Sequence, residues 1–104
     1  MTTQAGRGVR TVYGSTPVGT SDWVVIIPSL PLTVSSISIF DSSGQTMECG
    51  ICEATEVANS EVRQFIIPPG GTEAAIQIPA GQRLSIRAIS ATANAGENDT
   101  NVFF

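Results

Sequence analysis

The sequence predicts an all-β fold, an antiparallel sandwich of roughly seven or eight short strands. Apolar runs recur along the chain, and several of them alternate with polar residues in the period of a half-buried strand. Clusters of Pro, Gly, Asn, Asp and Ser separate the runs, and no stretch has a helical period. With 104 residues, 41% of them hydrophobic, the chain is long enough to enclose one core. We therefore expect a single domain over residues 9–104.

The first half of the chain is expected to hold an arm and four strands. Residues 1–8 include two glycines and have no apolar period, which indicates a flexible N-terminal arm. The expected strands cover residues 9–13, 23–27, 34–40 and 46–52. The turn residues Asp41, Ser42, Ser43 and Gly44 stand between the last two strands, so we expect these to form a hairpin.

The second half has the most regular alternation. Strands are expected over residues 61–67, 73–78, 83–89 and 101–104, separated by turns in which Gly81 favours a positive φ. In the segment 83–89, Leu84, Ile86 and Ala88 share one face, and Arg83, Ser85 and Arg87 share the other. This period of two predicts one buried face and one solvated face.

The charged residues are few and unusual in kind. They make up 13% of the chain, the net charge is -4, and there is no histidine. All five cations are arginines, at positions 7, 10, 63, 83 and 87, so lysine is absent as well. Without these two side chains the commonest general bases and Schiff-base nucleophiles are missing, which favours binding over catalysis. The acidic balance argues against a nucleic-acid partner.

The N-terminus and the cysteines bear on the compartment. Residues 1–8 lack the apolar segment of a secretory signal, and no apolar run is long enough to span a membrane. We therefore expect synthesis in the cytosol, with Cys49 and Cys52 as free thiols. Their CxxC spacing lacks the further ligands of a zinc site, and residues i and i+3 of a strand face opposite sides unless Gly50 forms a bulge. We expect small buried thiols, no metal and no cofactor.

The acidic side chains are expected to be solvated surface groups rather than a site. These are Glu48, Glu53, Glu56 and Glu61. A pair of catalytic carboxylates requires a deep cleft, for which a domain of this size has little room. The loop that contains Asn94, Glu97, Asn98 and Asp99 is richer in the oxygen ligands that calcium prefers, but its composition is typical of any loop, so we do not expect a calcium site there.

Four other side chains are candidate functional groups. Ser42 and Ser43 lie in a turn, but a serine nucleophile needs a base that this sequence does not supply. Trp23 precedes the apolar run 24–27 and is expected to be buried in the core. Tyr13 is the aromatic residue left for contact with a ligand such as a sugar.

The segments 65–71 and 78–88, with the sequences FIIPPGG and IPAGQRLSIRA, resemble the strand–turn–strand pattern of small jelly-roll virion proteins of tailed bacteriophages. In that group such strands occur in capsid decoration (cement) proteins, head fibres and tail modules. The resemblance covers mainly residues 61–104 and implies a jelly-roll-like sandwich. An immunoglobulin-like sandwich is the alternative arrangement of the same strands.

The resemblance also implies a function. A decoration protein, which is not an enzyme, would bind the major capsid protein at junctions of several subunits on the virion surface, after assembly in the host cytoplasm, and a homotrimer is the oligomer it implies. The expected contact residues are Arg7 and Arg10 in the arm, and Phe103 and Phe104 at the end of the chain. The alternative is a receptor- or glycan-binding module of a head fibre or tail, with Tyr13 and the polar loops as its contacts.

Overall fold

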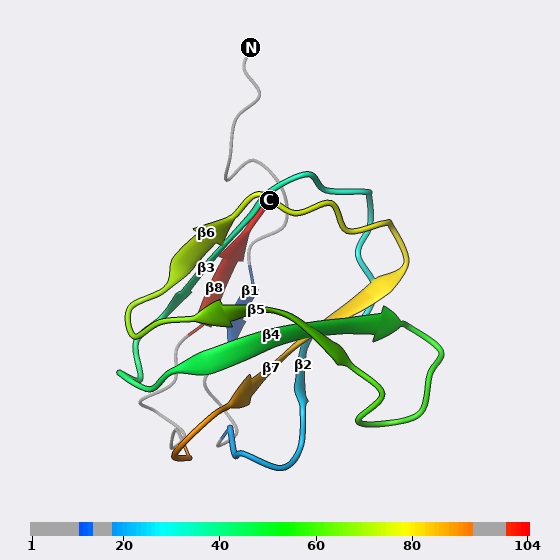
Figure 1. Ribbon diagram of the computed structural model, residues 1–104. Coiled ribbons are helices and arrows are strands. Elements are labelled where there is room, and N and C mark those ends of the chain that lie inside the picture. The colour runs from blue at the N-terminus through cyan, green and yellow to red at the C-terminus, as the bar shows by residue number, and fades with distance from the viewer. Residues whose placement is uncertain (1–10, 14–17, 93–99) are drawn as a thin grey trace.

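The chain folds into two stacked four-stranded antiparallel sheets (Figure 1). The structure is a computed structural model that describes residues 11–13, 18–92 and 100–104. The described strands are β1 (Thr11–Tyr13), β2 (Val24–Ile27), β3 (Ile37–Asp41), β4 (Met47–Glu53), β5 (Val62–Ile67), β6 (Thr72–Ala74), β7 (Gln82–Ala88) and β8 (Thr100–Phe103). The predicted all-β sandwich is confirmed. The expected arm lies outside the described residues, as do the first two residues of the strand expected over 9–13.

The order of the strands is that of a jelly roll. One sheet has the order β1-β8-β3-β6 and the other β2-β7-β4-β5. The pairs β1–β8, β2–β7, β3–β6 and β4–β5 are nested, as in one long hairpin whose tip is the connection between β4 and β5. The ladders β3–β8 and β4–β7 then close the rolled hairpin into two sheets. This nested order differs from the ABED/CFG order of the immunoglobulin-like alternative.

The predicted hairpin between 34–40 and 46–52 is wrong. β3 lies between β8 and β6, whereas β4 lies between β7 and β5 in the other sheet. The turn at 41–44 therefore carries the chain from one sheet to the other. The Asp41 carboxylate accepts hydrogen bonds from the Ser43 backbone N–H at 3.2 Å and from Thr100 Oγ1 at 3.0 Å, which ties this crossing to β8. Turn residues serve a crossing and a hairpin equally well, so their presence could not distinguish the two.

The strand predicted over 73–78 is shorter than expected. β6 ends at Ala74, and Ile78 forms an isolated antiparallel bridge with Val34. Each of these two residues donates its backbone N–H to the other's carbonyl oxygen at 2.9 Å. The chain between β6 and β7 is thus held by one bridge to the segment that precedes β3.

The core between the sheets contains the side chains that the alternation predicts to be buried. Leu84, Ile86 and Ala88 of β7 are buried, as are Met47 and Cys49 of β4. Buried apolar side chains from both sheets and their connections complete one cluster: Val18, Ile26, Ile27, Leu30, Val34, Ile37, Ile39, Ile67, Ile78 and Val102. Gly44 and Gly81, at φ 79° and 89°, occupy the left-handed conformation that their turns require.

Candidate contact faces

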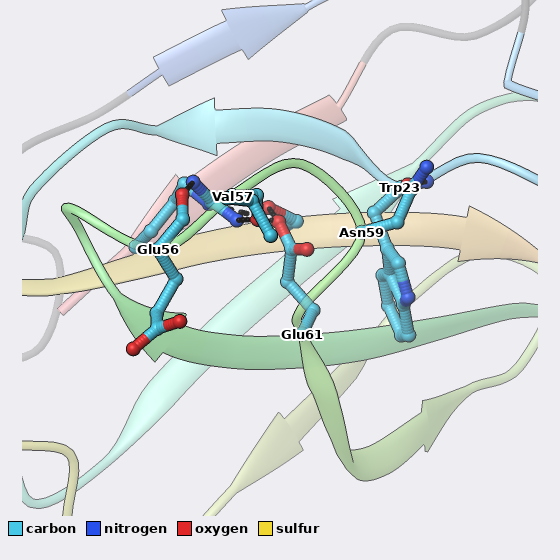
Figure 2. A network of polar contacts seen from close by, with 7 residues as sticks. Trp23, Glu56, Val57, Asn59 and Glu61 are labelled. Atoms are coloured by element: carbon cyan, nitrogen blue, oxygen red, sulfur yellow. Dashed lines mark hydrogen bonds and ion pairs between the residues drawn. The ribbon is translucent and has the colours of Figure 1, made fainter.

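The outer face of the β2-β7-β4-β5 sheet is covered by the connection between β4 and β5. We call residues 54–61 the closing loop. In Figure 2 its residues Glu56, Val57, Asn59 and Glu61 lie over the sheet, beside Trp23. The outward side chains of β7 were expected to be solvated, but Ser85 and Arg83 are buried beneath this loop. That expectation is wrong because a segment distant from β7 in sequence folds back over it.

Arg83 holds the closing loop with its whole guanidinium group. Arg83 Nε donates to Glu61 Oε2 at 3.0 Å, while Nη1 and Nη2 donate to the backbone carbonyls of Glu56 and Val57 at 2.9 and 3.0 Å. Ser85 Oγ donates to the same Glu61 oxygen at 2.5 Å. The planar fork of arginine makes these bonds at once, which a lysine could not do.

The network shifts the pKa values of its charged members. Burial raises the pKa of Glu61, but hydrogen bonds from Ser85 and Arg83 outweigh this effect and leave that pKa below the ordinary value. The hydrogen bond to Glu61 raises the pKa of Arg83. Both groups are therefore charged at neutral pH, and they form an ion pair that is nearly closed off from solvent.

Asn59 fastens the closing loop to the segment just before β2. The Trp23 backbone N–H donates to Asn59 Oδ1 at 2.8 Å, and Asn59 Nδ2 donates to Asp22 Oδ1 at 3.0 Å. Asn59 has φ 65°, a left-handed conformation that asparagine tolerates better than most residues. The loop is thus held by β7 on one side and by the segment before β2 on the other.

Trp23 is buried as expected, but on the outer face of the sheet rather than in the core between the sheets. A Cβ atom added to Gly50 would lie 2.7 Å from the Trp23 ring, so only glycine fits beneath the indole. The Arg87 guanidinium lies 4.2 Å from the ring centroid, in cation–π geometry. Trp23 therefore forms a second, small apolar centre under the closing loop.

Glu48 forms ion pairs with two arginines on the same outer face. Its Oε2 is 2.8 Å from Arg87 Nε, and its Oε1 is 3.6 Å from Arg63 Nε. Glu48 and Glu61 are buried, so the expectation of solvated acids is wrong for both. Each has an arginine partner that offsets the cost of its burial. The expectation is confirmed for Glu53 and Glu56, which are exposed.

The two cysteines face opposite sides of β4, as predicted. Cys49 is buried in the core, and burial raises the pKa of its thiol. Cys52 faces the closing loop. The pKa of its thiol is raised mainly by burial and, to a smaller extent, by the negative charge of Glu61. The register irregularity next to Gly50 lies in the pairing of β4 with β5, so it does not bring the sulfurs together. Both cysteines are free thiols that favour the protonated form.

The outer face of the β1-β8-β3-β6 sheet carries an aromatic pair. The rings of Phe40 and Phe103 meet edge to face with centroids 6.1 Å apart, and Phe40 is 47% exposed. A shallow depression of about 470 Å³ adjoins them, lined by Phe40, Asp41, Ser42, Gly70 and Asn101. This face therefore combines an exposed aromatic surface with a polar rim.

The predicted contact residues fall in different places. Phe103 belongs to the aromatic pair, whereas Phe104 is half-buried and packs against the core. Arg7 and Arg10 lie outside the described residues, as does the loop with Asn94, Glu97, Asn98 and Asp99. The side chain of Tyr13 is also outside the described part of the chain.

Sequence reasoning missed the network under the closing loop. Its members come from β4, β7 and the segments before β2 and β5, and no local pattern connects them. One signal was present: Ser85 and Gly50 are small residues on the outward face of neighbouring central strands. Small residues at such positions indicate that another segment packs closely there.

In the ranges 11–13, 18–92 and 100–104, no group of three or more Cys, Asp or Glu side chains is placed to hold a metal ion. The same part of the chain has no helix of the length and apolarity needed to cross a membrane. No family model, no curated protein and no solved structure matches the sequence or the fold.

Proposed function

We propose that the protein is a structural component of a virion, a decoration protein that binds the major capsid protein of a tailed bacteriophage. The proposal is carried by one observation, the jelly-roll strand order with an exposed aromatic pair on one layer. Jelly rolls serve as viral capsid and lectin domains. Because one fold serves many functions, the argument depends on the surface as well as on the topology.

The use of the charged side chains supports binding rather than catalysis. Arg83, Glu61 and Ser85 fasten the closing loop, and Arg87 and Glu48 pair with each other beside Trp23. These groups stabilise the fold, and the thiols of Cys49 and Cys52 favour the unreactive protonated state. These charged side chains thus hold segments of the chain together.

The aromatic pair provides a means of attachment. Aromatic side chains are enriched at interaction hot spots because they bury a large area with little loss of conformational entropy. Phe40 is exposed and already oriented by its contact with Phe103, so it can enter a pocket of the coat protein without rearrangement. Many such contacts on a lattice stabilise the shell, since the protein would bind only assembled subunits.

The test uses empty shells assembled from the coat protein encoded in the same genome. The protein should co-sediment with the shells in many copies and raise their melting temperature. The variant Phe40→Ala should reduce the bound amount at least tenfold, whereas Leu32→Ala, an equally exposed apolar residue in a connection, should not. Failure of the unchanged protein to bind the shells would overturn the proposal.

A glycan- or receptor-binding module is the second candidate, and the shallow depression favours it. The depression places the Phe40 ring beside Asn101 and Ser42, an apolar surface with polar neighbours that suits one face of a sugar. Binding of the isolated protein to a glycan array, abolished by Phe40→Ala and without effect on shells, would support this function instead.

A further inference from the structure

We propose that two copies of this chain associate about a two-fold axis through the outer face of the β2-β7-β4-β5 sheet. The contact consists of Glu56 and Val57 on the closing loop together with Arg63 and Ile66 on β5, which we call the paired patch. This association does not depend on the proposed function, because it needs neither a shell nor a glycan.

Several exposed apolar side chains lie on this face of the sheet. Val57 is the most exposed large hydrophobic residue described, at 76%. Val25 and Ile66, which pair with the outward residues Ser85 and Glu48, are exposed on the same face. A group of exposed apolar residues on one side of a small protein is typical of an interaction surface.

An extra residue in β5 places Arg63 and Ile66 on the same side as the closing loop. In the register with β4, Arg63 is opposite Gly50 and Ile66 is opposite Glu48. Gly50 and Glu48 are two residues apart and share the outward face, which the closing loop and Arg87 also contact. Arg63 and Ile66 are three apart, and they share that face only because the strand bulges between them.

The closing loop is held in place by hydrogen bonds within the single chain. Arg83 binds the carbonyl oxygens of Glu56 and Val57, the two residues that the loop contributes to the paired patch. Asn59 fixes the following turn to Asp22 and Trp23. A surface that is already ordered loses little conformational entropy when it binds, so a small contact area gives a measurable affinity.

The charges of the paired patch are complementary to themselves. Glu56 is exposed beside Val57, and the Arg63 side chain is 54% exposed on the same face as Ile66. Arg63 is 3.6 Å from Glu48, whose closer partner is Arg87, so Arg63 can turn to another carboxylate at small cost. A two-fold axis sets Glu56 and Val57 of one copy against Arg63 and Ile66 of the other, and the reverse.

This self-complementarity favours a second copy over a different protein. A patch with one sign of charge would repel its own copy and require a partner of the opposite sign. In the paired patch Glu56 is beside Val57, and Arg63 is on the same face as Ile66. Two identical patches can therefore form two Glu56–Arg63 ion pairs and two Val57–Ile66 contacts. The resulting pair differs in symmetry from the trimer implied by the resemblance.

Sedimentation over a series of protein concentrations, with mass determination, tests the proposal. The unchanged chain should shift from monomer to dimer as its concentration rises. Glu56→Arg and Arg63→Glu should each weaken the dimer roughly tenfold, because each creates two like-charge contacts. The double variant with both changes should restore dimerisation. Glu73→Arg, the same change of charge on the opposite sheet, is the matched control and should have no effect.

Val57→Ser gives a second measurement that leaves every charge in place. The side chain is exposed, so circular dichroism should show an unchanged fold while the dimer weakens. A chain that stays monomeric at all concentrations, a trimer, or a double variant that does not regain dimerisation would overturn the proposal. Shell binding by the single charge variants separates this outcome from a failure of the proposed function.

Discussion

Arg83 and Glu61 meet 3.0 Å apart on the outer face of a sheet, although 22 residues separate them in the sequence. The pair joins a central strand, β7, to the last residue of the closing loop. Through the same guanidinium the chain also binds two backbone carbonyls of that loop. One side chain therefore supplies three of the hydrogen bonds that hold the closing loop over this sheet.

Replacing Arg83 by lysine should destabilise the fold by about 1–3 kcal/mol, because the charge remains but the forked hydrogen bonds are lost. The free energy of unfolding in urea measures this. Arg63→Lys is the matched control, and its effect should stay within about 0.5 kcal/mol since that side chain is largely exposed. Equal effects of the two substitutions would show that the fork of Arg83 is not what holds the loop.

Acid should destabilise the protein through Glu61. Its pKa in the folded state lies below the ordinary value of 4.5, so its contribution to stability is present above pH 4.5. That contribution is lost as the pH falls through the lower, folded-state pKa. The free energy of unfolding should therefore decrease with acidification in this range, and it should decrease less steeply in Glu61→Gln. A variant that keeps the slope of the unchanged protein would assign the acid sensitivity to other carboxylates.

Gly50→Ala should cost about 1–3 kcal/mol of stability, because the added methyl group would lie 2.7 Å from the Trp23 ring. Thermal unfolding measures the loss, and the tryptophan fluorescence should change as the indole is displaced. Gly19→Ala is the control, since a Cβ there would lie at 3.8 Å from Thr92 Oγ1, an ordinary contact. Unchanged stability of Gly50→Ala would mean that the indole moves freely.

The two thiols should differ in their reaction with a thiol reagent. Cys52 is partly accessible and should react slowly in the native protein, because its pKa is raised. Cys49 is fully buried and should react only after unfolding. Counting the modified thiols by mass spectrometry, with Cys52→Ser as the control, checks this. Fast reaction of both in the native state would contradict the assignment of Cys49 to the core.

Most of the strand content could be predicted, because alternation is a local property. Leu84, Ile86 and Ala88 were assigned to the core from their spacing, and all three are buried. Trp23 is buried, as predicted, but its location on the outer face of the sheet was not predicted. The period of a strand tells which residues share a face, and it does not tell what covers that face.

The network under the closing loop could not be predicted, because it depends on contacts between distant segments. Ser85 and Arg83 have the polarity of solvated positions and are buried only because residues 54–61 fold over them. The bulge that aligns Arg63 with Ile66 is likewise visible only in the register with β4. A turn such as 41–44 is compatible with a hairpin and with a crossing, and the pairing of β3 with β8 decided between them.

By itself, the amino-acid order determined an all-β chain with one apolar interior, because short-range periodicity and turn residues suffice for that outcome. The tertiary structure alone decided the jelly-roll winding, the burial of Glu61 beside Arg83, and the exposure of Phe40 next to Phe103 on the opposite layer. These features depend on contacts between residues that are far apart in the sequence. The free energies of such contacts cannot be read from the local sequence pattern.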